Sequence, residues 1–303
     1  MPIISARDAE FSKVDWIPTG ITKLDSALGG GIPTKRITEV FGPYSSGKTS
    51  LALLAVSSAQ EKGYTSLWCD QEWSWEPIYA EKVGVDVDSL LLLQEHHAED
   101  ALEAIEEYIT AHPNTFVVID AIGALSPRAE AEKAVGEKTI GGQASLIAKF
   151  CRKIVPLLAI KNCALLVINH QFTDIMTGAL KSSGGAKLEY HKSLSLSLKR
   201  KYGATAKRAS DGKIFEVVVE AEVRKNKLAG TLGTKIDLFM EPGSGFLVEG
   251  DLFQEVLDKG IISRIKNSYF YADEKLGTQK AAKEWVRSHA DELKNALQTT
   301  TGV

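Results

Sequence analysis

The segment Gly42–Ser50, Gly-Pro-Tyr-Ser-Ser-Gly-Lys-Thr-Ser, most constrains the fold, because it matches the phosphate-binding pattern G-x-x-x-x-G-K-[ST]. An apolar strand-like run, Ile37–Phe41, precedes it, and a helical run, Leu51–Gln60, follows it. In this setting backbone N–H groups converge on a phosphate, and the helix N-terminus adds its positive dipole. The alternative is a Gly-rich turn before an ordinary helix. Because both flanking elements are present, the pattern favours nucleoside triphosphate binding.

The motif also predicts individual roles. Gly42 and Gly47 permit the tight turn, and Lys48 reaches the β- and γ-phosphates. Thr49 places its hydroxyl on Mg²⁺. Asp120 closes an apolar strand, where it could simply cap the strand, but the upstream phosphate loop favours a place in the same Mg²⁺ shell. The nucleotide-contacting residues predicted in the loop are Gly42, Pro43, Tyr44, Ser45, Ser46, Gly47, Lys48, Thr49 and Ser50.

Composition sets the broad class of the protein. The chain has 303 residues, 44% of them hydrophobic and 25% charged, which is typical of a globular protein with one large and one smaller domain. It has no run of 18 apolar residues and no signal-like N-terminus, so no membrane association is expected. Cys69 and Cys163 lie in apolar runs, which indicates buried free thiols and a cytoplasmic location.

Charge is distributed unevenly along the chain. Between residues 70 and 107, 12 acidic residues face one lysine, whereas between residues 181 and 227, 12 Lys/Arg face five Asp/Glu. Such runs are usually solvated surface. Beside a nucleotide motif, however, the basic region offers a face for a polyanion.

Short apolar runs alternate with helical patterns through the first two thirds of the chain, which predicts a doubly wound, mostly parallel α/β sheet. The expected strands are 37–41, 65–70, 90–93, 115–120 and 164–169, and the expected helices are 51–60, 77–83, 98–111 and 142–161. After residue 190 the period changes to two, and the runs 193–198 and 214–223 predict an antiparallel hairpin that extends the sheet.

The run Glu241–Gly245, Glu-Pro-Gly-Ser-Gly, is the best boundary between domains. We expect a short N-terminal segment over 1–32 that contacts another subunit, a core over 33–240, and a small C-terminal α/β domain over 241–303 with two or three helices and a hairpin near Tyr269.

Polar side chains follow the predicted strands where a parallel sheet binds its ligands. Glu72 can orient a water molecule at the γ-phosphate, although on position alone Asp70 is an equal candidate. Asn169 and His170 could sense that phosphate or could simply form a strand-end turn.

Two long polar connections, 130–142 and 172–187, are typical of functional loops. Arg152, Lys181 and Lys187 could contact nucleic-acid phosphates there. The run Arg224–Lys227 is either a basic strand end or a finger that reaches a neighbouring subunit's nucleotide.

Together these motifs resemble the RecA family of bacterial and phage recombinases, from about residue 16 to about residue 290. The stretches that carry the resemblance are 18–29 (PTGITKLDSALG), 42–49 (GPYSSGKT), 76–80 (EPIYA), 84–88 (GVDVD), 124–130 (ALSPRAE), 184–185 (GG) and 225–227 (KNK).

The resemblance implies a RecA-type ATPase core, ATP and Mg²⁺ as cofactors, and specific roles for residues of this chain. Glu72 becomes the catalytic carboxylate, with Lys48 beside it. The other residues implied are Glu76 and Tyr79 at the adenine, Asn169 and His170 as the link from the γ-phosphate to DNA, Ile140, Arg152, Lys181, Gly184, Gly185 and Lys187 at DNA, and Lys225 and Lys227 acting across a subunit interface.

Some positions depart from the bacterial pattern. His170 stands where glutamine is usual and is similar to the UvsX-type recombinases of T4-like phages, Trp73 replaces a histidine, and Ser145 replaces an arginine. About sixteen residues precede the first matching stretch, and an acidic C-terminal tail is absent. We therefore predict a phage-like member with its own mode of filament assembly.

The function that follows is a DNA-dependent ATPase that forms helical filaments on single-stranded DNA and catalyses homologous pairing and strand exchange with double-stranded DNA. Expected partners are further copies of the chain, a single-stranded-DNA-binding protein and loader proteins. The expected location is the cytoplasm of a bacterial cell, with phage infection as one setting. The alternatives are a nucleotide-gated paralog that regulates recombination without strand exchange, and another RecA-core DNA motor.

Overall fold

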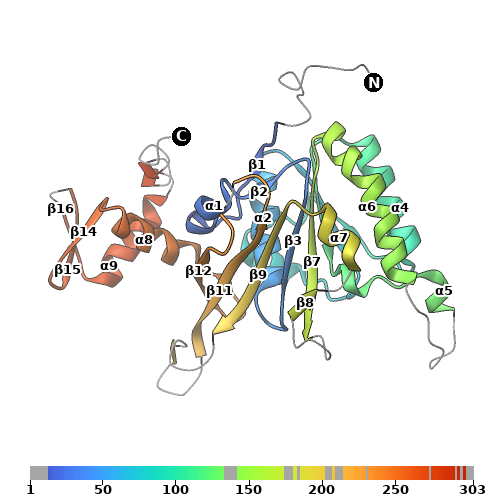
Figure 1. The fold of residues 1–303 in the computed structure, drawn as a ribbon. Coiled ribbons are helices and arrows are strands. Elements are labelled where there is room, and N and C mark those ends of the chain that lie inside the picture. The colour runs from blue at the N-terminus through green and yellow to red at the C-terminus, as the bar shows by residue number, and fades with distance from the viewer. Residues whose placement is uncertain are drawn as a thin grey trace.

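The computed structural model describes residues 13–132, 142–173, 180–182, 185–201, 207–208, 214–229, 231–272, 274–290, 292–293 and 296–297. Among them, a large sheet has the strand order β13-β12-β11-β9-β3-β7-β6-β4-β5 (Figure 1), and off this path β8 pairs with β7 and β10 pairs with β11. Helices cover both faces of this sheet, as the alternating apolar runs predict. No helix in this part of the chain is long and apolar enough to cross a membrane.

Six neighbouring strands run parallel: β9 (Leu194–Lys201), β3 (Ile37–Gly42), β7 (Ala164–Thr173), β6 (Thr115–Asp120), β4 (Thr65–Asp70) and β5 (Leu90–Leu93). The ends of these strands are in register. Gly42 on β3 is opposite His170 on β7, and Asp70 on β4 is opposite Asp120 on β6.

The antiparallel extension is confirmed. β9 (Leu194–Lys201) lies parallel to β3, and β11 (Ile214–Asn226) pairs antiparallel with both β9 and β12 (Lys235–Glu241). β13 (Gly245–Phe246) ends the sheet. β10 (Lys207–Arg208) pairs with β11, and β1 (Trp16–Ile17) pairs with β2 (Ile32–Pro33) in a separate two-stranded sheet.

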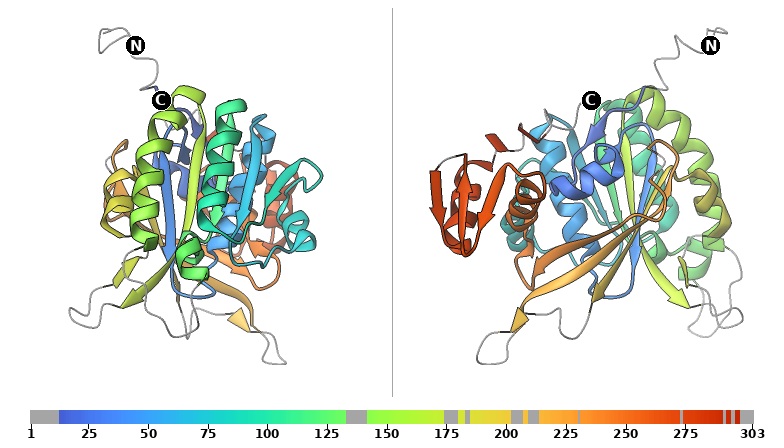
Figure 2. Two further views of the ribbon diagram at one scale, coloured as in Figure 1. Left: turned by 90° about the vertical axis from the view of Figure 1, so that its right-hand side faces the viewer. Right: turned by 60° about the vertical axis from the view of Figure 1, so that its left-hand side comes forward.

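Two hydrophobic clusters hold the helices on opposite faces. On one face α1 (Thr22–Leu28), α2 (Lys48–Glu61) and α3 (Pro77–Val83) contribute to the first cluster. On the other face α4 (Ala98–Ala111) and α6 (Gly142–Lys161) lie side by side over the second (Figure 2). The predicted bounds of α3, α4 and α6 agree with the structure. Short η3 (Ile122–Ala124) and α5 (Arg128–Ala131) follow β6.

The segment 172–187, predicted as a long connection, contains regular structure. β7 continues to Thr173 and pairs antiparallel with β8 (Leu180–Ser182), and α7 (Gly185–His191) follows. Leu188 of α7 is buried in the second cluster, and this apolar contact holds a short helix that its polar sequence does not predict.

A third hydrophobic cluster is formed by residues between 252 and 297, at the end of the chain. It contains α8 (Val248–Asp258), α9 (Gln279–Ser288) and the antiparallel strands β14 (Ile262–Ile265), β15 (Ser268–Tyr271) and β16 (Glu274–Gly277). α8 contacts α1 and β12. The proposed domain boundaries, at 32 and at 240, stay predictions.

Candidate functional site

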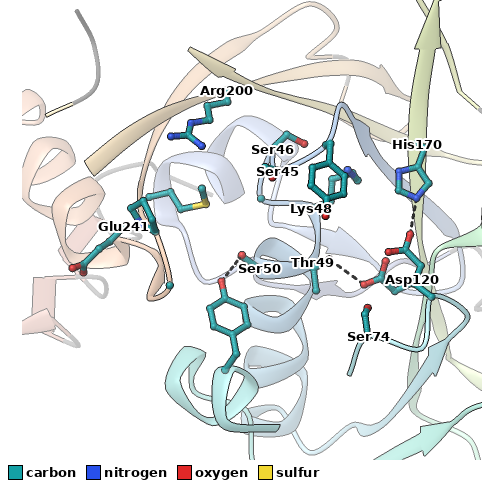
Figure 3. Close-up of a pocket in the computed structure, with 17 residues that line it drawn as sticks. Ser45, Ser46, Lys48, Thr49, Ser50, Ser74, Asp120, His170, Arg200 and Glu241 are labelled. Carbon is teal, nitrogen blue, oxygen red and sulfur yellow. Dashed lines mark hydrogen bonds and ion pairs between the residues drawn. The ribbon is translucent and has the colours of Figure 1, made fainter. Parts of the chain in front are cut away.

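A cavity of about 520 Å³ lies where the parallel strands end, within the size range of small-ligand sites. One wall is formed by Tyr44–Ser50, the part of the phosphate loop that lines the cavity (Figure 3). The other lining residues are Glu72, Ser74, Tyr79, Asp120, His170, Arg200, Met240, Glu241, Pro242 and Gly243. Segments far apart in the sequence therefore meet at one site.

The glycines of the loop are required by close approaches. A Cβ on Gly42 would lie 2.2 Å from the carbonyl oxygen of Leu198 on β9, so no side chain fits there. Gly47 has φ of 87°, and its Cβ would lie 2.8 Å from Phe246 of β13. Gly47 is also the N-cap residue of α2, so the N-terminus of this helix lies at the cavity.

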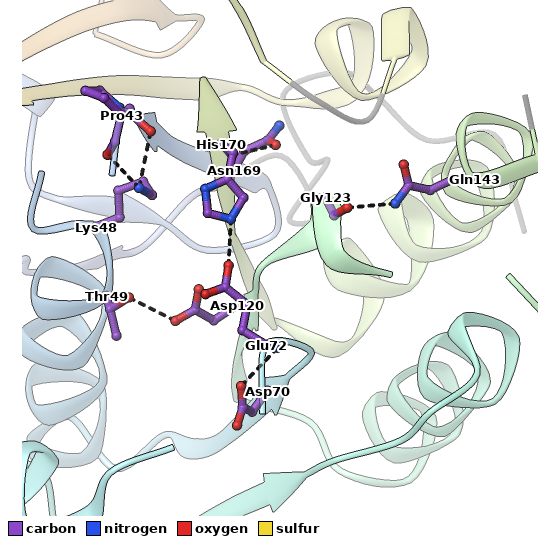
Figure 4. Close-up of polar contacts among 11 residues, drawn as sticks. Pro43, Lys48, Thr49, Asp70, Glu72, Asp120, Gly123, Gln143, Asn169 and His170 are labelled. Carbon is purple, nitrogen blue, oxygen red and sulfur yellow. Dashed lines mark hydrogen bonds and ion pairs between the residues drawn. The ribbon is translucent and has the colours of Figure 1, made fainter. Parts of the chain in front are cut away.

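Lys48 and Ser46 fit an anionic ligand. Burial lowers the pKa of Lys48, opposed by the charges of Asp120 and Glu72, and its Nζ donates to the carbonyl oxygens of Gly42 (3.2 Å) and Pro43 (2.9 Å) (Figure 4). The Ser46 hydroxyl is buried and has no hydrogen-bond partner among the described residues. A phosphate oxygen would satisfy both groups.

Thr49 and Asp120 are brought together as predicted. The Thr49 hydroxyl donates to Oδ2 of Asp120 at 3.0 Å. Burial raises the pKa of Asp120 to about 7, and the nearby Glu72 charge acts in the same direction. A hydroxyl and a carboxylate suit Mg²⁺, which takes few protein oxygens and completes its shell with phosphates and water. The described residues contain no group of three or more His, Cys, Asp or Glu side chains that could hold a metal ion.

The carboxylates of Glu72 and Asp70 have different contacts, which distinguishes the two candidates. Asp70 is buried, and its carboxylate accepts from the backbone N–H of Glu72 (3.2 Å) and Trp75 (3.0 Å) and from Nε2 of Gln94 (2.9 Å). It therefore holds the turn in shape. Glu72 lines the cavity, and its Oε1 lies 2.6 Å from Nε2 of His170. Of the two carboxylates, Glu72 is the one placed to act on a ligand.

Asn169 does not share the position of its neighbour. Its side chain is fully buried, donates from Nδ2 to Oε1 of Glu39 at 2.9 Å and accepts from the N–H of His170 at 2.9 Å. His170 lines the cavity, whereas Asn169 is not among the residues that line it. Asn169 therefore contacts His170 from outside the cavity, through the backbone N–H of His170.

The two residues implied at the adenine differ in position. Tyr79 lines the cavity, and its hydroxyl lies 2.5 Å from that of Ser50. Glu76 is exposed and caps the N-terminus of α3, where its carboxylate accepts from the N–H of Ile78 at 3.1 Å.

The turn that follows β12 forms the facing wall of the cavity, and Lys82 of α3 donates to the carbonyl oxygen of Gly243 in this turn at 2.8 Å. Sequence reasoning missed this turn and Arg200, because neither carries a phosphate-loop pattern.

The residues predicted to bind DNA or act across an interface lie elsewhere. Arg152 and Lys187 are exposed on α6 and α7, Lys181 is in β8, and Gly185 begins α7. Ile140 and Gly184 are outside the described residues. Lys225 donates to the carbonyl oxygen of Glu189, and Lys227 donates to that of Tyr190 at 3.1 Å, so both lysines contact α7 rather than the cavity.

Known proteins match the part of the chain that forms the cavity. The RecA N-terminal domain family matches residues 2–244, which contain every residue of the cavity. The protein RecA of Thermotoga neapolitana is 35% identical over 274 residues, 89% of this chain and 76% of its own length. RecA of Thermus aquaticus is 36% identical over 286 residues (93% and 83%), and RecA of Bartonella quintana is 34% identical over 299 residues (96% and 85%).

The substitution Glu72→Gln tests the position of this carboxylate. Gln keeps the size but cannot accept a proton from water, so ATP turnover should fall about 100-fold or more while ATP binding persists. Single-turnover hydrolysis and equilibrium binding of a fluorescent ATP analogue measure the two effects. Glu81→Gln, on the exposed side of α3, is the matched control. Normal turnover in Glu72→Gln would remove this residue from its assigned role.

Proposed function

The chain belongs to the RecA family, and from that premise we propose that it is an ATP-dependent DNA recombinase that forms helical filaments on single-stranded DNA and exchanges strands with double-stranded DNA. The observation that carries this proposal is the meeting of the phosphate loop with Glu72, Asp120 and His170 in one cavity. The region between residues 181 and 227, with 12 Lys/Arg against five Asp/Glu, adds positive charge for a nucleic-acid backbone.

ATP is proposed to lie along the phosphate loop, with its γ-phosphate at the ends of β4, β6 and β7. Lys48 would then contact phosphate oxygens in place of the carbonyls of Gly42 and Pro43, and Ser46 would gain a phosphate oxygen as its partner. Tyr79 would border the adenine with Glu76 nearby. Thr49 and Asp120 would hold Mg²⁺, which supplies charge neutralisation for the phosphates when bound.

Hydrolysis would depend on Glu72, which orients water and accepts its proton. His170 contacts Glu72 at 2.6 Å, so a γ-phosphate that attracts His170 would change the freedom of the carboxylate. Asn169 fixes the backbone from which His170 projects. This arrangement gives a means by which the catalytic group responds to the nucleotide.

DNA is proposed to contact the residues that the family resemblance implies, which are Ile140, Arg152, Lys181, Gly184, Gly185 and Lys187. Lys225 and Lys227 are proposed to reach the ATP of the adjacent subunit, so the nucleotide would lie at a subunit interface of the filament. A single-stranded-DNA-binding protein, loader proteins, a cytoplasmic location and a phage origin remain part of the proposal.

The function predicts that single-stranded DNA raises ATP turnover by the purified chain by about tenfold or more, and that the same samples contain helical filaments. Phosphate release with and without DNA, together with negative-stain imaging, measures both. DNA-independent turnover with closed rings would favour another RecA-core motor. DNA binding with filaments but no strand exchange would favour a regulatory paralog.

The substitution Lys227→Ala should lower DNA-stimulated turnover by about 100-fold or more, since a charge that stabilises the transition state across the interface would be lost. Nucleotide binding by the isolated chain should be unchanged, because Lys227 does not line the cavity. Lys235→Ala, an exposed lysine of β12, is the control. Full DNA-stimulated activity in Lys227→Ala would refute the action across the interface.

The raised pKa of Asp120 predicts a pH dependence of Mg²⁺-dependent ATP binding. Below about pH 7 this carboxyl is protonated, and the proton competes with the cation, so affinity should be about tenfold lower at pH 6 than at pH 8. The dependence should flatten in Asp120→Asn, a comparison that also accounts for titration of the nucleotide itself. ATP affinity is measured by titration at several pH values and fixed free Mg²⁺. An equal dependence of affinity on pH in the wild type and in Asp120→Asn would contradict the metal role of Asp120.

A further inference from the structure

A buried ion pair lies outside the cavity, at the centre of the sheet. Glu39 of β3 is fully buried, and its Oε2 accepts from Nζ of Lys192, whose side chain is 3% exposed. The Ser195 hydroxyl donates to the same oxygen at 2.8 Å, and Asn169 donates to Oε1 at 2.9 Å. Both oxygens of this carboxylate are therefore occupied, which offsets the cost of burying its charge.

The pair joins two parts of the molecule. Glu39 is three residues before Gly42, where the phosphate loop begins, and it is opposite Val167 on β7 and Ser195 on β9. Lys192 follows the last residue of α7, and its backbone N–H donates to the carbonyl oxygen of Leu188 at 3.0 Å. The ion pair therefore connects the end of α7 to β3, the strand that leads into the phosphate loop.

From Glu39 the contacts continue to the cavity. Asn169, held by Glu39, accepts from the N–H of His170, and the imidazole of His170 contacts Glu72. In the other direction, the backbone carbonyls of α7 at Glu189 and Tyr190 accept from Lys225 and Lys227. One continuous set of polar contacts therefore runs from these lysines through α7 to Glu72.

We propose that Glu39 and Lys192 are positioning residues, which hold α7 against the strand ends so that a displacement of α7 reaches the contact between His170 and Glu72. The inference rests on the proposed function, because it makes α7 the element through which bound DNA regulates ATP turnover. Neither residue lines the cavity, so neither touches the nucleotide. A buried ion pair often adds no net stability over a well-packed apolar pair, so we assign this one a role in the placement of α7.

The test variant is Glu39→Gln/Lys192→Met in the full chain. It removes both charges together, because Lys192→Met alone would leave a buried, uncompensated carboxylate. The matched control is Glu189→Gln, which removes the other, exposed partner of Lys192, at 2.6 Å, and leaves Glu39 paired. Ser195→Ala is a milder variant that keeps both charges and is used if the double variant does not fold.

Two measurements decide the proposal. In the double variant the stimulation of ATP turnover by single-stranded DNA should fall about tenfold, with KM for ATP within about twofold of wild type. Without DNA or nucleotide, amide hydrogen exchange should become faster in α7 and at the end of β7, where Asn169 holds the N–H of His170. Glu189→Gln should match wild type in both.

The outcomes are separable. A wild-type chain that DNA does not stimulate would refute the proposed function, and hydrogen exchange would still decide whether the pair positions His170. A wild-type chain that DNA stimulates, with equal stimulation and exchange in the double variant, would overturn the positioning role. Loss of a cooperative thermal transition in Ser195→Ala as well would assign the pair to folding alone and would also overturn it.

Discussion

The register of the parallel strands is the constraint on which the rest of the structure depends. Hydrogen bonding places Gly42 opposite His170 and Asp70 opposite Asp120, so the phosphate loop, His170 and these carboxylates lie at the same edge of the sheet. A slip of one residue would move every side chain to the other face of the sheet. Two apolar clusters pack the helices onto this sheet, and in this arrangement the phosphate loop, Glu72 and His170 line one cavity.

Much of the fold could be predicted from the sequence. Each of the runs 65–70, 77–83, 98–111 and 115–120 forms the expected element. In these runs either the spacing of the hydrophobic residues is regular, or a residue such as Pro77 marks where the helix starts. The helix α7 could not be predicted, because its sequence is short and mostly polar, and the contact of Leu188 with the second cluster is long-range.

The site was predicted as far as its motifs reach. Asp120 ends β6, His170 lies in β7, and Lys48 and Thr49 begin α2, and all four line one cavity. The turn at 241–243 reaches the cavity through the pairing of β12 with β11, and no local pattern marks it as part of the site. Glu39 carries a signal of its own in the sequence. A carboxylate within the buried run Ile37–Phe41 needs a partner, but the sequence does not say that Lys192 supplies it.

The most direct measurement of the central claim is a structure of the chain with Mg²⁺ and a non-hydrolysable ATP analogue. The account predicts that Lys48 leaves the carbonyls of Gly42 and Pro43 to bind the phosphates, that the γ-phosphate lies within hydrogen-bond reach of His170, and that Glu72 faces it. A nucleotide bound away from the strand ends, or a γ-phosphate remote from both Glu72 and His170, would contradict the account.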